Sequence, residues 1–435
     1  MKQKRKIGIV KVAAAVLSLV FLAAGCGGSK TTGPTGPVTI KIWKTFEDSE
    51  NLQELFDEYR QKNPNVEIVY TKKNIETYEE DLVDALASGS GPDIFSIHND
   101  WLPRYLDKTA PAPDKAFLYK DYKDTFVDAV VQDFTKNNKV YGTAMAVDSL
   151  ALYYNKDIMG SAGIAVPPKT WDELASHVQR LKRSDGKGYF TQSGVAIGTN
   201  GNVNRAVDIL YLMMLQQRTT PFNSDGTEPQ FARDISKDGN RFYPGQAALD
   251  YYTSFANPVS MNYNWNSRSD YSIDAFANGR AAYLYSYSYT RQSLVQKNPN
   301  LNFDVAPVPQ PDLDQPSVNF ANYWGEVVSK QSKNQAVAWD LLKFLSSKGA
   351  LDKYYAKNKQ PSSRKDLIEL QINDPEIGVF AHANLTAKTF YKPNQTKIDN
   401  IFGKMIDNVI LNGVSVQDSL SQAEQQAAVV SRSYQ

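Results

Sequence analysis

Hydrophobic and polar positions follow two alternating periods along this chain of 435 residues. Apolar runs of strand length are followed by segments in which apolar side chains recur every three or four positions, as on one face of a helix. The first strands are expected over 38–43, 66–70 and 93–97, and the first helices over 52–59 and 78–86. Strands that alternate with helices predict an α/β fold built on a mostly parallel sheet.

A very apolar strand is predicted over 146–156, with one carboxylate, Asp148, near its start. An unpaired charge in such a strand is costly, so Asp148 needs a partner. A structural ion pair and a ligand contact would both meet this need, and the pattern does not decide between them. A capping box at Thr170 and Glu173 then begins a helix and a second α/β unit.

A tyrosine stripe marks the strand predicted over 280–289. Tyr283, Tyr285, Tyr287 and Tyr289 lie two positions apart and share one face of it. Such a stripe usually packs into a core, and a ligand role is favoured only at its carboxyl end. A long surface loop is expected over 219–243. The other strands are expected over 303–308 and 323–328, and the other helices over 274–278, 336–347, 350–355, 398–411 and 416–430.

The first 25 residues resemble the signal peptide of a bacterial lipoprotein. Met1–Lys6 is basic, 12–24 is apolar, and Leu22–Cys26 resembles a lipobox, which implies cleavage before Cys26 and a lipid on its thiol. The apolar run is too short for a transmembrane helix, which needs about 20 residues. Residues 26–37 are rich in Gly, Ser, Thr and Pro and are expected to form a flexible tether. We therefore expect a lipid-anchored protein at the cell membrane, on its extracellular or periplasmic side.

Charge and cysteine content exclude several classes of function. The formal net charge of +1 turns slightly negative without the five basic residues of the leader, which gives no support for nucleic-acid binding. The single cysteine is the predicted lipid attachment site, so none is left for thiol catalysis or a metal site. No zinc-protease, phosphate-loop or nucleophile-elbow motif is present, and neither a metal nor a cofactor is expected. A carboxylate pair for glycoside hydrolysis stays open.

Several motifs together resemble the sugar-binding family of extracellular solute-binding proteins of ABC importers, the maltose-binding-protein-like family. The motifs lie at 146–156 with 168–174, at 92–95 with 98–100, at 276–282, at 334–345 and at 358–359, and the resemblance covers about residues 38–411. It implies two α/β lobes joined by a hinge that closes on a ligand. The N-terminal lobe is expected to comprise 38–146 plus about 305–346, and the C-terminal lobe 147–304 plus about 347–435. Crossings are expected near 144–149, near 302–308 and after 346.

The implied function is capture of a carbohydrate, expected to be an oligosaccharide, and its delivery to the permease subunits of an ABC transporter by a monomeric protein without enzymatic activity. The alternatives are a binding protein for another polar solute, namely a polyamine, a peptide or a phosphorylated polyol, and, less favoured, a lipid-anchored glycoside hydrolase or lyase. A carbohydrate site needs aromatic rings beside Asp, Asn or Glu acceptors, because sugars present apolar faces and hydroxyl groups.

Predicted strand ends supply such pairs of residues. The candidate ligand-binding residues, taken from these strand ends and from the resemblance, are Trp43, Glu47, Asn99, Asp100, Asp148, Ser286, Tyr287, Tyr289, Trp324 and Glu326. Two of the positions depart from the family pattern. Asn99 replaces an acid, and residues 286–289 read Ser-Tyr-Ser-Tyr in place of the usual strand end. The resemblance therefore does not predict which sugar is bound.

Overall fold

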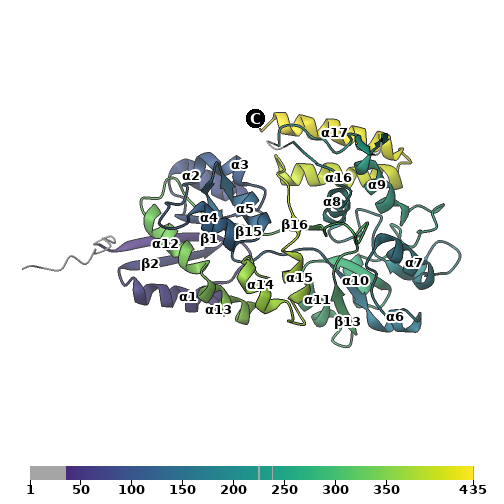
Figure 1. Ribbon diagram of the computed structural model, residues 1–435, viewed down its shortest axis with the longest axis horizontal. Coiled ribbons are helices and arrows are strands. Elements are labelled where there is room, and N and C mark those ends of the chain that lie inside the picture. Colours follow the sequence, from purple (N-terminus) through teal and green to yellow (C-terminus); the bar gives the residue numbers. More distant parts are fainter. Residues whose placement is uncertain (1–35, 224–225, 238, 435) are drawn as a thin grey trace, which may run out of the picture.

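Two lobes lie side by side along the long axis of the molecule (Figure 1). The computed structural model describes residues 36–223, 226–237 and 239–434. The predicted signal peptide, Cys26 and all but the last two residues of the predicted tether lie outside the described residues. Within the described ranges, no helix combines the length and the apolar character that crossing a bilayer requires.

The first lobe is built on a five-stranded sheet. Its strand order is β2-β1-β3-β15-β6, with bounds Val66–Lys72, Val38–Lys44, Ile94–His98, Trp324–Val328 and Gly142–Thr143. The helices whose side chains enter its core are α1 (Ser49–Lys62), α2 (Tyr78–Ser88), α3 (Leu102–Tyr105), α4 (Tyr119–Thr125), α5 (Asp128–Phe134), α12 (Gln335–Leu345), α13 (Lys348–Asn358), α14 (Lys365–Gln371) and α15 (Gly378–Ala383). A short 3-10 turn η1 (Leu106–Lys108) and a hairpin of β4 (Thr135–Lys136) and β5 (Lys139–Val140) complete this lobe.

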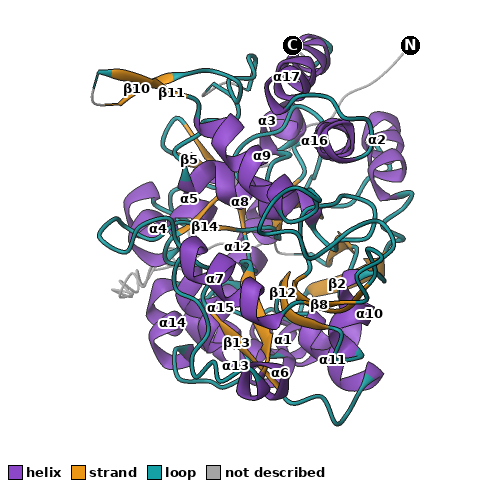
Figure 2. Ribbon diagram, turned by 90° about the vertical axis from the view of Figure 1, so that its right-hand side faces the viewer, coloured by secondary structure: helices purple, strands orange, loops and turns teal. Residues whose placement is uncertain are grey.

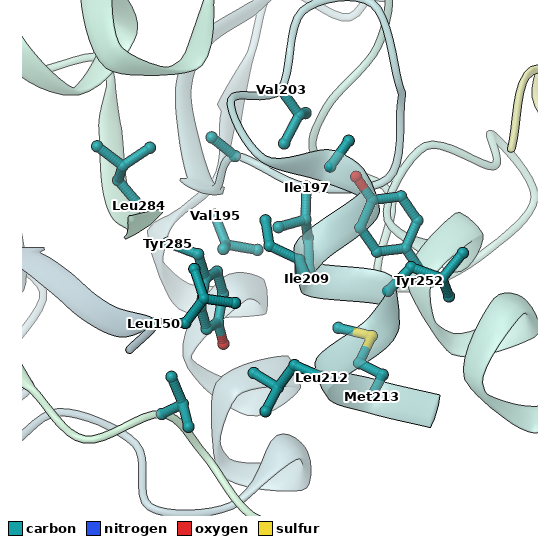
Figure 3. Close-up of a cluster of buried hydrophobic side chains, with 14 of the residues drawn as sticks. Leu150, Val195, Ile197, Val203, Ile209, Leu212, Met213, Tyr252, Leu284 and Tyr285 are labelled. Carbon is teal, nitrogen blue, oxygen red and sulfur yellow. The ribbon is translucent and has the colours of Figure 1, made fainter. Parts of the chain in front are cut away.

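The second lobe is built on another five-stranded sheet. Its strand order is β13-β7-β12-β9-β8, with bounds Phe303–Ala306, Ala151–Asn155, Ala281–Ser286, Phe190–Val195 and Arg183–Ser184. Its helices are α6 (Lys156–Ser161), α7 (Trp171–Leu181), α8 (Ala206–Gln216), α9 (Pro244–Ser254), α10 (Ser272–Ala277), α11 (Thr290–Lys297), α16 (Gln395–Ile410) and α17 (Val416–Arg432). Figure 3 shows part of its core, where Ile209 and Leu212 of α8 face Val195 and Tyr285 of the sheet.

Both sheets are mixed, and this corrects the expectation of mostly parallel sheets. β1 runs parallel to β2 and β3, but β15 runs antiparallel to both β3 and β6. In the second sheet only the β12–β9 pair is parallel. The antiparallel strand β15 follows a passage from the other lobe. β15 enters the sheet at the end that lies nearest the other lobe and runs away from that end. β3 runs toward it, so the two strands are antiparallel.

Several predicted elements have different bounds in the structure. The strand expected over 146–156 forms only at β7, so Asp148 precedes it. The strand expected to end at Tyr289 stops at Ser286, and Tyr289 is the N-cap of α11. The loop expected over 219–243 contains a hairpin, β10 (Ile235–Lys237) with β11 (Asn240–Phe242). The predicted cap of α7 is present, because the Thr170 hydroxyl accepts the Glu173 N–H at 3.2 Å.

The chain passes between the two cores three times within the described residues. Val147 is buried in the first core and Leu150 in the second, while Phe320 is buried in the second and Ala321 in the first. The last passage lies between Ala387 and Ile398 and follows α15 (Gly378–Ala383) and the short strand β16 (Ala387–Lys388). The sequence assigned residues 305–320 to the first lobe and 347–368 to the second. In the structure, Val308 and Phe320 are buried in the second core, and α13 and α14 pack in the first.

Candidate functional site

The three passages between the lobes are hydrogen-bonded to one another. The N–H of Asn322 donates to the Asp148 carbonyl at 3.0 Å, and β14 (Asn319–Phe320) pairs in parallel with β16. The Ser149 hydroxyl donates to the Asn384 side chain at 2.6 Å, and the amide of Asn384 donates to the Val147 carbonyl at 2.8 Å. These bonds join the three segments into one hinge, with the ends of the strands of each sheet lying on either side of it.

Aromatic side chains from several elements gather at the edge of the first sheet where β1 and β3 end and β15 begins. The half-buried ring of Trp324 lies 5.1 Å from Trp101, 5.5 Å from His98 and 5.6 Å from Phe46, measured between ring centroids. Phe46 follows β1 and is 61% exposed, which is unusual for so large an apolar side chain. The sequence analysis proposed Trp324 and did not include Phe46.

A buried ion-pair network lies next to these aromatic side chains in the first lobe. Lys44 Nζ lies 2.6 Å from Glu326 Oε1 and 3.0 Å from Glu47 Oε2. Burial alone would lower the pKa of Lys44, but the carboxylates of Glu326 and Glu47 outweigh it and raise that pKa. Glu326 is 4% exposed and occupies the middle of β15. Glu326, predicted as a ligand contact, is bound to Lys44 in this structure.

A second buried cation connects the two lobes. Lys392, on the last passage, places Nζ 3.6 Å from Asp100 of the first lobe and 3.2 Å from Asp399 of α16 in the second. Burial would lower the pKa of Lys392, but the carboxylates of Asp399 and Asp100 raise it. His98 Nδ1 lies 2.6 Å from the other oxygen of Asp100. Asp100, predicted as a ligand contact, is 3% exposed and belongs to this bridge.

The predicted contact residue Asn99 belongs to a buried cluster around Asp133 of α5. The Asp133 carboxylate accepts hydrogen bonds from the Thr389 hydroxyl at 2.6 Å, from the Tyr323 hydroxyl at 2.7 Å and from the Asn99 amide at 3.2 Å. Thr389 lies on the last passage, so this carboxylate also fixes the hinge to the first lobe. Burial raises the pKa of Asp133 to about 7, although the three donors oppose the rise.

This raised pKa predicts how stability depends on pH. Between the ordinary pKa of an aspartate and about 7, folded Asp133 holds a proton that the unfolded chain has released, so the contribution of Asp133 to stability falls as pH rises. We expect Asp133→Asn to remove a decline in the free energy of unfolding on the order of 2–3 kcal/mol across this window. Urea unfolding at several pH values measures it. Asp128→Asn, on the same helix, is the control, and an unchanged slope in Asp133→Asn would contradict the assignment.

In the second lobe, Asp148 has a hydrogen-bonding partner rather than a charged one. Its carboxylate accepts from the Ser288 N–H at 3.0 Å and from the Ser288 hydroxyl at 2.7 Å. Burial raises the pKa of Asp148 to about 6 despite these donors. The bonds fix the turn between β12 and α11, and therefore fix where Tyr289 is presented. Asp148 therefore holds the backbone at Ser288, next to the candidate residue Tyr289.

The Tyr289 ring is presented to solvent beside an arginine that the sequence analysis did not single out. Tyr289 is 50% exposed, and its hydroxyl accepts from Arg205 Nε at 3.0 Å. The guanidinium lies 5.5 Å from the Tyr287 ring and 3.8 Å from the Asp208 carboxylate. Arg205 caps α8 with a φ of 59°, a conformation uncommon for a residue other than glycine. These contacts hold the Tyr289 ring and the Arg205 guanidinium in a fixed position relative to each other.

The remaining predicted residues lie beneath the surface or to one side. Tyr287 is 1% exposed and donates to Asp208 at 2.9 Å. Ser286 is fully buried, with its hydroxyl 2.7 Å from that of Thr290. Trp43 alternates with Lys44 along β1, and its ring contacts the ammonium of Lys73 at 4.3 Å. The structure thus presents Trp324, Tyr289 and the newly found Phe46 and Arg205 at the inter-lobe edges, and uses most of the other candidates as support.

Metal and pocket geometry add nothing to this edge. Across the described part of the chain, no group of three His, Cys, Asp or Glu side chains is placed to hold a metal ion. A surface pocket lined by Phe117, Phe126 and Arg364 lies elsewhere in the first lobe, and its arginine already pairs with Asp366.

Comparison with known sequences decides the family. The model of the bacterial extracellular solute-binding proteins matches residues 43–351. The chain belongs to this family. Among curated relatives, the arabinooligosaccharide-binding protein of Bacillus subtilis (strain 168) is 24% identical over 406 residues, with 90% of this chain and 86% of the relative covered. The maltotriose-binding protein of Pyrococcus abyssi (strain GE5 / Orsay) is 23% identical, with 87% and 76% covered.

Solved structures of similar fold agree with the two-lobed architecture. The sugar-binding protein MalE of Xanthomonas citri superimposes with a TM-score of 0.75 at 21% identity, covering 91% of this chain and 98% of that one. The cyclic alpha-maltosyl-1,6-maltose binding protein of Arthrobacter globiformis gives a TM-score of 0.75 at 18% identity, with 92% and 100% covered. These similarities confirm the predicted two-lobed α/β fold of this solute-binding protein.

Proposed function

We propose that this solute-binding protein captures a carbohydrate, of oligosaccharide size, between its two lobes and delivers it to the permease of an ABC importer. The observation that carries the proposal is the pairing of exposed rings with fixed polar groups at both inter-lobe edges. Phe46 and Trp324 supply apolar faces in the first lobe, and Tyr289 with Arg205 supplies a face and a donor in the second. A sugar ring offers matching apolar faces and hydroxyl groups.

Charge balance at this edge favours a neutral ligand over the charged alternatives. Lys44 and Lys392 are each paired with two carboxylates, and Arg205 lies beside Asp208. A polyamine site would need spare carboxylates, and a phosphorylated polyol would need spare cations. A neutral polyhydroxylated ligand requires neither. Three of the relatives are named as binding arabinooligosaccharide, maltotriose and galactooligosaccharide, which supports the same choice.

Binding without catalysis belongs to the same proposal. Glycoside hydrolysis needs two carboxyl groups facing the scissile bond. Here Glu326 is held by Lys44 and Asp148 by Ser288, so both carboxylates are already engaged within the protein. We further propose that a lipid on Cys26 anchors the protein, on the basis of the lipobox-like sequence. We also propose that it is a monomer, as the family resemblance implies.

The test is a thermal-shift screen of residues 26–435 carrying Cys26→Ser, against arabino-, malto-, galacto- and manno-oligosaccharides, followed by calorimetric titration of the hits. Ligand at about 100 times its dissociation constant adds about 2.7 kcal/mol to stability, which moves the melting temperature visibly. Stabilisation by an oligosaccharide would support the proposal. Stabilisation only by spermidine, peptides or sugar phosphates would replace it with the corresponding alternative.

Replacing Tyr289 by Ala is expected to weaken binding of the oligosaccharide found in that screen by about thirtyfold, or about 2 kcal/mol, because the exposed ring face is lost. Tyr289→Phe keeps the ring and loses only the bond to Arg205, so we expect a smaller loss. Tyr189→Ala, an exposed tyrosine elsewhere on the second lobe, is the matched control. Calorimetry gives the three dissociation constants, and equal affinity for Tyr289→Ala and wild type would remove Tyr289 from the site.

A further inference from the structure

A cationic surface lies on the second lobe at the end of α7. It is formed by the side chains of Arg180, Lys182, Arg183, Lys187 and Arg268, and we call it, together with Val259 and Met261, the basic loop face. α7 lies toward the end of the long axis away from the first lobe (Figure 1) and is turned toward the viewer in Figure 2. The face is therefore separate from the inter-lobe edges described above.

The positive charge of this face is not neutralised by ion pairs. Arg180 donates to the Ala162 carbonyl at 2.7 Å, Arg183 to the Arg180 carbonyl at 2.6 Å, and Arg268 to the Gly188 carbonyl at 2.7 Å. Among the described residues, no carboxylate lies within 4.0 Å of any of the five cations. One acid, Asp185, lies in the same loop. The backbone N–H groups of Lys187 and Tyr189 donate to it and lower its pKa, and the charge of Arg268 lowers that pKa further, so Asp185 offsets part of the positive charge.

Two aliphatic side chains project from the same face. Val259 is 91% exposed and Met261 is 81% exposed, separated only by Ser260. The loop that carries them is held in place, because the Lys182 ammonium donates to the carbonyls of Met261 at 2.7 Å and of Tyr263 at 3.2 Å. The loop therefore presents two apolar tips at a fixed place next to the ammonium of Lys182.

We propose that the basic loop face binds an anionic phospholipid surface. Anionic head groups attract clustered Lys and Arg at about 1 kcal/mol for each, and the acyl boundary accepts aliphatic tips without a shaped pocket. A specific protein partner would instead require about 800 Å² per side around a packed apolar core, usually with aromatic anchors. The basic loop face offers two exposed apolar tips, Val259 and Met261, on a loop that Lys182 holds beside the other cations. This arrangement matches a lipid surface better than a protein interface.

Vesicle co-sedimentation tests the proposal with residues 26–435 carrying Cys26→Ser, which retain every described element and remove the predicted lipid. Vesicles of equal parts phosphatidylglycerol and phosphatidylcholine are expected to bind the protein, and phosphatidylcholine alone is not. Binding should weaken as salt shortens the range of the charges. Arg183→Gln with Lys187→Gln should weaken it about 25-fold, at about fivefold for each charge.

Matched controls separate this face from general charge and apolarity. Val259→Ser with Met261→Ser should weaken binding about tenfold, whereas Leu370→Ser with Leu411→Ser, also exposed apolar residues, should not. Lys120→Gln with Lys136→Gln is the charge control for the first lobe. Absence of binding to either vesicle, equal binding to both, or equal losses in variants and controls would overturn the proposal. So would loss of transport in the Val259 and Met261 variant without any vesicle binding, which would assign the face to a protein partner.

Discussion

Replacement of Lys392 by Met is expected to lower the free energy of unfolding by about 3–5 kcal/mol, because Asp100 and Asp399 would be left buried without their cation. Met fills much of the same volume, so the loss reports charge rather than a cavity. The bridge joins the lobes. We therefore also expect amide hydrogens of the hinge region to lose their protection from exchange at a lower temperature in the variant than in the wild type. Urea unfolding gives the stability.

The matched controls use the same chemistry at other positions. Lys120→Met removes an exposed cation that lies 3.3 Å from Asp124, and should cost less than about 1 kcal/mol. Lys392→Met combined with Asp100→Asn and Asp399→Asn removes the stranded charges and should recover part of the loss. A single Lys392→Met variant as stable as wild type would show that the three charged groups are solvated rather than buried.

Lys44→Met is expected to cost a similar amount, about 3–5 kcal/mol, because Glu326 lies in the middle of β15 and Lys44 is its partner at 2.6 Å. The measured quantity is again the free energy of unfolding. Adding Glu326→Gln should make the double variant more stable than Lys44→Met alone, since an amide replaces an unpaired carboxylate. Lys72→Met, which breaks the exposed pair with Asp48, is the control. If the double variant were no better than Lys44→Met, the ion pair would not explain the loss.

The first strands and helices of the first lobe, β1, α1, β2, α2 and β3, were predictable because each depends on local pattern. The stripe of Leu52, Leu55, Phe56 and Tyr59 predicted α1, whose buried face consists of those four residues. The direction of a strand was harder to predict, since nothing in the sequence of β15 indicates that it runs antiparallel to β3. The passages between lobes were placed too early at residues 305 and 346, because apolar residues such as Val308 pack equally well in either core.

Among the candidate site residues, exposure could be predicted only where a strand end presents a ring. Tyr289 follows β12 and is exposed, as the carboxyl-end argument requires. Arg205 and Lys392 carry no motif, and their roles arise from contacts with residues far away in the chain, Tyr289 for Arg205 and Asp100 for Lys392. The local sequence around Arg205 or Lys392 does not reveal these distant partners. The burial of Ser286 and Glu326 could not be predicted either. A polar residue in a strand gives the same sequence pattern whether its side chain faces a ligand or another side chain of the protein.

The interleaving of the two cores sets the order in which this protein can be completed during synthesis. In the first sheet, β15 (Trp324–Val328) lies between β3 and β6, and α12 to α14 close the same core. A nascent chain that ends at residue 147 therefore has every earlier strand but a gap in its sheet and no cover for one side. The first lobe cannot close until residues near 368 have left the ribosome, and contacts so distant in sequence form slowly. A chain with an export signal, as predicted here, would thus stay unfolded long enough to be threaded through a secretion channel before either lobe is complete.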